Sequence, residues 1–216
     1  MTALDTTADQ SALLDTPVAP AVVGPLAGDP AALGLPSFIV GSVALGLALV
    51  GVVPATAGGA SLPIILAATS AGLFVATIWS AAIGQSAVAS IFGIFAGFWL
   101  SYAVLVLGLT HNWFGITADA VKSTQELFLT TWLILIVLLT LATLRLPVAF
   151  TVLFVLIDLA LLLILIGTAQ ASTGLLKTAG YVVLAFAAVG AYLFVGAAAQ
   201  ATGGRAVPLG QPVLRA

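Results

Sequence analysis

One acidic residue lies where a membrane-spanning helix is expected. Asp158 falls near the middle of the apolar segment 148–167, where an ionisable side chain costs about 2.5–3.5 kcal/mol on insertion scales. No Lys or Arg lies within any predicted span, and Arg145 is roughly 20 Å away along a helix. Asp158 is therefore protonated, hydrogen-bonded to a neighbouring helix or in contact with a wet cavity. We expect Asp158 to be a proton-coupling carboxylate on a transport path. The alternative is that Asp158 is a neutral acid hydrogen-bonded to a packed Ser or Thr.

Other residue types that could do chemistry are few. The single histidine, His111, is expected in a loop beside a span end, and the chain has no cysteine. We therefore expect no metal site and no thiol chemistry. The sequence contains no Ser/His/Asp triad, HExxH motif or glycine-rich phosphate loop. We expect neither enzyme activity nor a cofactor.

Aromatic residues recur at helical spacing in the segment 86–109. Such a stripe is usually a packing surface, and the lining of a pore is the alternative. The residues are Phe92, Phe95, Phe98, Trp99 and Tyr102.

The composition is that of a membrane protein. Hydrophobic residues make up 62% of the 216 residues and charged residues 6%, and the mean hydropathy is +1.29. A bilayer offers no water to the backbone, so spans must be helices or a closed barrel, and long unbroken apolar runs exclude the barrel. With five Lys and Arg in total, the chain has no basic stripe for nucleic acid.

The apolar runs predict an all-α, multi-pass protein with a bundle of six transmembrane helices. Runs long enough to cross a bilayer are 34–54, 62–84, 86–109, 125–143, 148–167 and 179–199. The longest loop is expected between Thr110 and Glu126. Small residues at packing intervals, such as Ser42 with Gly46, should let helices approach closely.

The domain boundaries follow from these spans. Residues 29–203 are predicted to form the transmembrane domain, and residues 204–216 a cytoplasmic C-terminal tail. Residues 1–28 carry three Asp, three Pro and no Lys or Arg, which predicts a disordered cytoplasmic tail rather than a secretory signal. We expect the protein in the cell membrane.

Four motifs, in order along residues 29–210, resemble those of the acetate uptake transporter family. Residues 29–35 (DPAALGL), followed by Phe38, resemble the NPAPLGL signature that opens the first helix of the family. Residues 92–99 (FGIFAGFW) resemble its F-x-x-Y-G-x-F-W motif. Residues 143–167 resemble its T-L-K/R turn and following helix, and residues 204–210 (GRAVPLG) its G-R-x-x-x-P-x-G tail.

The chain also departs from the family pattern. Asp29 and Ala32 replace the Asn and second Pro of the signature, and the Gln and Glu of the family's second helix are absent although its Trp is present as Trp79. Asp158 stands at a position where the resemblance implies an uncharged polar residue such as Thr. The resemblance therefore implies the fold more directly than the choice of substrate.

The resemblance implies a homohexamer in which each protomer has its own pore for acetate or a similar small monocarboxylate, moved with protons. The matching constriction residues are Phe38, Phe95 and Ile157. The implied substrate-binding residues are Asp29, Pro30, Leu33, Gly34 and Leu35.

In the predicted mechanism, the substrate waits near the signature and then passes the constriction. Asp158 exchanges a proton on the way. Since no span has a basic residue, backbone N–H groups at the helix start would attract the anion, and Asp29 would compete with it. The alternatives are conduction or export of ammonia through a narrow apolar pore, and a non-transporting membrane scaffold of the same fold.

Overall fold

The protein is a bundle of six helices that are long and apolar enough to cross a membrane. The computed structural model describes residues 24 and 26–215. The spans are α2 (Ala31–Val50), η2 with α3 (Ile64–Ser70 and Ala71–Ala82), α4 (Ser86–Thr110), α5 (Val121–Ala142), α6 (Val148–Ala169) and α7 (Thr173–Ala201). Two short 3₁₀ turns, η1 (Ala55–Ala57) and η3 (Ala118–Ala120), lie in the connections. The predicted all-α fold with six spans is confirmed.

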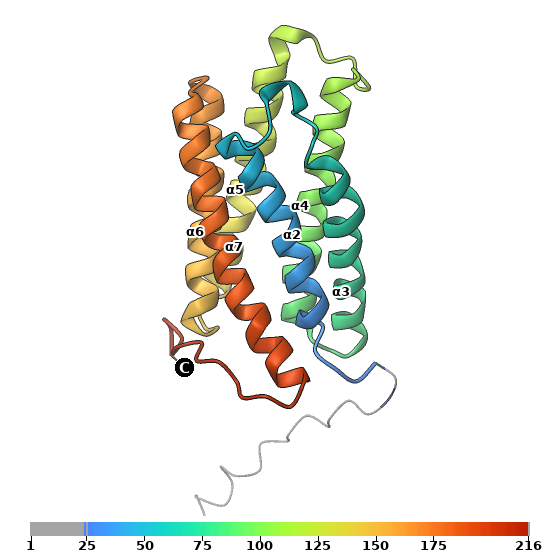
Figure 1. Ribbon diagram of the computed structural model, residues 1–216, viewed down its shortest axis with the longest axis vertical. Coiled ribbons are helices and arrows are strands. Elements are labelled where there is room, and N and C mark those ends of the chain that lie inside the picture. Colours follow the sequence, from blue (N-terminus) through green and yellow to red (C-terminus); the bar gives the residue numbers. More distant parts are fainter. Residues whose placement is uncertain (1–23, 25, 216) are drawn as a thin grey trace, which may run out of the picture.

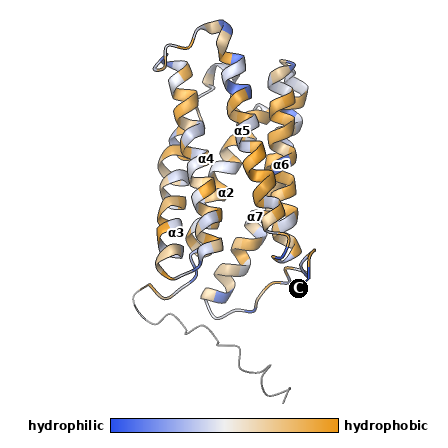
Figure 2. Cartoon of the chain, turned by 180° about the vertical axis from the view of Figure 1, so that it is seen from behind, coloured by the Kyte–Doolittle hydropathy of each residue, from blue (hydrophilic) through white to orange (hydrophobic). Residues whose placement is uncertain are grey.

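The helices are arranged around a shared interior (Figure 1). Helix α2 packs against α7, α7 against α6 and α6 against α5, while α3 with η2 packs between α2 and α4. The start of α2 and the end of α7 lie at the same end of the bundle (Figure 1). Hydrophobic residues cover most of the helix length and hydrophilic ones gather toward the helix ends (Figure 2), as a lipid environment requires.

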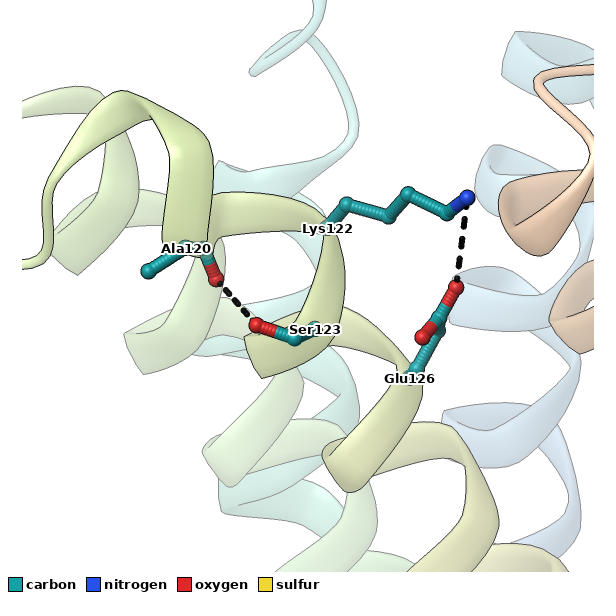
Figure 3. Close-up of polar contacts among 4 residues, drawn as sticks. All are labelled: Ala120, Lys122, Ser123 and Glu126. Carbon is teal, nitrogen blue, oxygen red and sulfur yellow. Dashed lines mark hydrogen bonds and ion pairs between the residues drawn. The ribbon is translucent and has the colours of Figure 1, made fainter.

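Helix α5 begins four residues earlier than the predicted span, at Val121. The turn η3 leads directly into the helix, and Lys122 forms an ion pair with Glu126 at 3.7 Å (Figure 3). The Ser123 hydroxyl donates to the carbonyl of Ala120 at 3.0 Å. These local bonds extend the helix past the apolar run, so the predicted loop between Thr110 and Glu126 is shorter than expected.

The ends of α7 and α2 also differ from the predicted spans. Helix α7 begins at Thr173 rather than 179, because the Ser172 side chain caps it by accepting from the N–H of Leu175 at 3.3 Å. Helix α2 ends at Val50 rather than 54, since Gly51 adopts a left-handed conformation with φ 90°. A hydropathy profile reveals neither the Ser172 cap nor the left-handed Gly51.

Small residues bring α2 and α7 together, as predicted. Ser42 and Gly46 are both buried on α2. Across the contact, Gly180 of α7 lies so close to α2 that an added Cβ would be 2.8 Å from Leu49 Cβ and 3.0 Å from the backbone N of Val50. Close backbone approach of this kind replaces the hydrophobic drive that is missing in lipid.

The C-terminal segment folds back onto the bundle. The N–H of Ala149 donates to the carbonyl of Leu209 at 3.0 Å, and the Tyr192 hydroxyl donates to the carbonyl of Pro208 at 2.6 Å. Pro147 and Pro212 form an isolated antiparallel bridge. The described part of the predicted tail thus holds the start of α6. The predicted N-terminal tail lies outside the described residues, apart from residue 24 and residues 26–28.

The approach at Gly180 predicts a stability effect. Gly180→Ala should lower the thermal unfolding temperature in detergent, at a cost of about 1–3 kcal/mol for overpacking, because Val50 contributes a backbone atom that cannot rotate away. Gly174→Ala is the matched control on the same helix, where the nearest atom, Ser172 Oγ, is 3.9 Å from the added Cβ. The control should be neutral or stabilising, and equal unfolding temperatures for both variants would contradict the packing described here.

Candidate functional site

A vestibule opens at the end of the bundle where α2 begins. It has a volume of ≈ 240 Å³, and its walls come from α2, α4, α6 and the turn before α6. Its lining residues are Asp29, Ala31, Leu35, Phe38, Val88, Ile91, Phe92, Phe95, Leu146, Phe150, Leu153 and Phe154. Asp29 carries the only charged side chain among them, so the vestibule is an apolar chamber with one carboxyl group in its wall.

A smaller inner cavity of ≈ 30 Å³ lies further along the bundle. Its lining residues are Phe38, Leu45, Phe95, Phe98, Trp99, Ile157, Ala160, Leu161, Ile164, Val183 and Phe186. Phe38 and Phe95 line both cavities. These two rings therefore form the partition between the vestibule and the inner cavity.

Aromatic contacts close this partition. The ring centroids of Phe38 and Phe95 are 5.1 Å apart in an edge arrangement, and those of Phe38 and Phe186 are 5.7 Å apart. Phe95 also stacks on Phe154 at 6.1 Å. Four rings from four helices thus interlock, each at the favourable separation for aromatic pairs, and a solute could pass only if at least one ring moved.

The structure brings the three predicted constriction residues to one place. Phe38, Phe95 and Ile157 are each 5% exposed, and all three line the inner cavity. The sequence did not single out Phe186, which completes the partition from α7. It is the only aromatic residue between Tyr181 and Tyr192, and its size among smaller neighbours is the one signal that could have marked it.

The signature residues occupy different positions around the vestibule. Asp29 and Leu35 line it. Pro30 is fully buried at the start of α2, Leu33 packs half-buried against the core, and the ring of Phe92 covers Gly34 so closely that no side chain would fit there. Of the five predicted binding residues, two reach the cavity and three shape the helix that carries them.

The backbone N–H groups at the start of α2 already have partners. The N–H of Ala31 donates to Asp29 Oδ1 at 2.9 Å. The next three N–H groups of the helix donate to the carbonyls of Asp29 and Pro30. Asp29 therefore occupies the position at the helix start where an anion would be attracted, and this end of the vestibule is negative.

Asp158 faces away from both cavities. Its Oδ2 accepts a hydrogen bond from the Thr140 hydroxyl of α5 at 2.7 Å, and its Oδ1 is buried without a hydrogen-bond partner among the described residues. Neither cavity is lined by this side chain. The carboxyl thus lies in the α5–α6 contact, one residue beyond Ile157, and a hydroxyl partner of the predicted kind is present.

Residues of the aromatic stripe of α4 line both cavities and also pack against α5. Phe92 lines the vestibule, and Phe98 and Trp99 line the inner cavity. Tyr102 lines neither and stacks on Phe98 with ring centroids 6.5 Å apart. On the outer side, Phe98 meets Trp132 of α5 at 5.4 Å, so the same stripe also joins α4 to α5.

These features define a multi-pass membrane protein whose interior holds two apolar cavities separated by an aromatic partition. A family model described as the GPR1/FUN34/yaaH family matches residues 15–205 of the chain. The chain belongs to this family, which confirms the family predicted from the four motifs.

A curated relative and a solved structure are among the proteins similar to the chain. Acetate permease A of Emericella nidulans is 33% identical over 153 residues, a match that covers 66% of this chain and 50% of the permease. The chain thus spans about half the length of that relative. The structure titled as the bacterial acetate channel SatP has a TM-score of 0.74 at 21% identity and covers 85% of this chain and 99% of the channel. The second comparison shows a shared fold.

Proposed function

We propose that the protein conducts acetate or a similar small monocarboxylate across the membrane, accompanied by protons. The observation that carries the proposal is the aromatic partition between two cavities in a chain of this family. The names of its relatives, an acetate permease and an acetate channel, support the choice of substrate.

The lining favours the neutral acid over the anion at the partition. Transfer of a carboxylate into an apolar, unpaired environment costs far more than transfer of a neutral group, and a second charge raises the cost again. Among the lining residues there is no Lys, Arg or His to offset that cost. A monocarboxylate that crosses with a proton is therefore the easiest solute, and a dicarboxylate is disfavoured.

The proposed route begins in the vestibule. The solute enters past Asp29 and rests against Leu35, where the cavity is large enough for a small acid. Gly34 and Pro30 act indirectly, since the first lets Phe92 pack against α2 and the second starts the helix. The solute then displaces Phe38 or Phe95 to reach the inner cavity beside Ile157.

We retain Asp158 as the proposed proton-exchanging group. The Thr140 oxygen is 2.7 Å from Asp158 Oδ2 and 2.9 Å from the carbonyl of Ile136, and one hydroxyl proton cannot fully satisfy both contacts. If the Thr140 hydroxyl donates to the carbonyl of Ile136, a proton on the Asp158 carboxyl group would satisfy the contact between Asp158 and Thr140. Because this group faces α5, it would act by changing the α5–α6 contact and with it the position of Ile157.

The remaining features of the proposal follow from the family resemblance. We infer a non-enzymatic protein of the cell membrane that assembles as a homohexamer with one pathway in each protomer. Many outward side chains on α3 and α5 are large and apolar, among them Val75, Ile78, Leu127 and Ile134. Lipid chains and neighbouring copies are the two environments that suit them.

Uptake of labelled acetate into proteoliposomes tests the proposal. Phe38→Ala should raise the uptake rate by about tenfold, which corresponds to ~1.4 kcal/mol removed from the barrier, because one ring of the partition is lost. Phe74→Ala is the matched control, since Phe74 lies on the outside of α3 and is 40% exposed. Its rate should equal that of the unmodified protein.

Other outcomes of the same assay would point elsewhere. Absence of acetate uptake together with swelling of the vesicles in ammonium salts would favour the ammonia pathway. If neither acetate uptake nor swelling in ammonium salts is seen, and the protein unfolds cooperatively, the result would favour a non-transporting scaffold. Equal rates of acetate uptake for Phe38→Ala and Phe74→Ala would show that the partition does not limit passage.

The proton role of Asp158 is tested with Asp158→Asn. The amide keeps the size of the side chain and can still bond the Thr140 hydroxyl, so the fold should be kept. We expect the stimulation of uptake by an inward proton gradient to fall to less than about one third of its original value, because a carboxamide neither takes up nor releases a proton in place of the carboxyl group. Unchanged rate and pH dependence would show that the proton crosses on the acid alone.

A further inference from the structure

The walls of the two cavities contain one side-chain donor that is always protonated. Of all the lining residues, only Asp29 and Trp99 carry a side-chain nitrogen or oxygen atom. An ionised Asp29 carboxylate only accepts hydrogen bonds, whereas an indole N–H only donates them. Among the described residues that line the two cavities, Trp99 is therefore the only one with an indole, amine, amide or hydroxyl donor, and it lies beyond the partition formed by Phe38 and Phe95.

The indole N–H of Trp99 has no hydrogen-bond partner among the described residues. The side chain is 1% exposed, and buried Trp N–H groups usually have a partner because an unpaired one costs free energy. Trp79 shows the ordinary arrangement, since its Nε1 donates to the carbonyl of Leu26 at 2.8 Å. An unpaired donor thus belongs to a side chain that lines the inner cavity.

Neighbouring rings hold the Trp99 side chain in place. Its ring lies edge-on to Phe98 at 5.1 Å, to Phe38 at 6.5 Å and to Tyr102 at 6.3 Å. A side chain locked by such contacts can form a hydrogen bond without a further cost in rotamer entropy. The contact with Phe38 also connects the donor to the ring that must move to admit a solute.

We propose that the Trp99 indole N–H donates a hydrogen bond to a carboxyl oxygen of the acid as it enters the inner cavity. The inference rests on the proposed function and adds to it the residue that recognises the carboxyl group beyond the partition. The inner cavity of ≈ 30 Å³ has room for about one or two water molecules. The acid therefore enters only as Phe38 or Phe95 swings away, which brings it into the cavity that Trp99 lines.

The direct test observes the four indole N–H groups of the chain by ¹H–¹⁵N spectroscopy of the full-length protein in nanodiscs. Single Trp→Phe variants assign the signals, and sodium acetate is compared with sodium chloride at equal pH and ionic strength. The Trp99 signal should move downfield and saturate with acetate. The Trp79 signal should stay in place because its N–H is already bonded. A Trp99 signal that responds no differently to acetate than to chloride would overturn the proposal.

A transport measurement provides a second test. Trp99→Phe should raise the KM for acetate by about three- to tenfold, the effect of losing one hydrogen bond, with little change in the maximal rate. Trp132→Phe is the control, because Trp132 packs against Phe98 from α5 and lines neither cavity. Equal KM values for the two variants would contradict the inference.

The two tests separate this inference from the proposed function. A saturable Trp99 shift in a protein that transports no acetate would support the donor role and overturn conduction. Acetate transport with an acetate-insensitive Trp99 signal would support conduction and overturn the donor role. Neither result depends on the folding of a Trp99 variant: both are read in the unmodified protein, and the Phe variants of the other three Trp residues leave the fourth signal to Trp99.

Discussion

The absence of water inside the bilayer is the constraint on which the rest of this structure depends. Every polar group within a span must find its partner inside the protein. Most hydroxyl groups of the spans meet this need by bonding carbonyls about one turn back, as Ser42 does to Phe38 and Ser80 to Ala76. Asp158 meets it at Oδ2 with Thr140 on the adjacent helix. Four buried side-chain atoms have no hydrogen-bond partner among the described residues: Thr69 Oγ1, Thr151 Oγ1, Asp158 Oδ1 and Trp99 Nε1. Of these four residues, only Trp99 lines the vestibule or the inner cavity.

The same constraint shapes the proposed pathway. A lumen lined by hydrocarbon side chains cannot replace the hydration shell of a carboxylate, so a proton must accompany the substrate or the anion must stay outside. Asp29 at the helix start makes the entrance negative and leaves no free N–H group for an anion there. The tail segment that holds Ala149 through Leu209 fixes the opposite wall of the vestibule, which Phe150 lines.

The sequence predicted the number of helices, their approximate spans, the family and the place of Phe38, Phe95 and Ile157 together, because long apolar runs and ordered motifs are strong signals. It did not predict the side toward which Asp158 points, since α6 is apolar all round and periodicity then marks no face. Helix starts such as that of α7 depend on a single cap, and the folded-back tail depends on backbone bonds between distant segments. Hydropathy contains neither kind of information.

The most direct test of the account asks whether the vestibule is the path of the acid. The chain has no cysteine, so Leu35→Cys in the vestibule and Gln211→Cys on the exposed tail each create a single reactive thiol for a methanethiosulfonate reagent. Labelling is measured by mass spectrometry. Modification at position 35 should abolish acetate uptake, and acetate should slow this modification. Modification at position 211 should leave uptake unchanged, and acetate should not slow it. Full uptake by protein completely modified at position 35 would contradict this prediction.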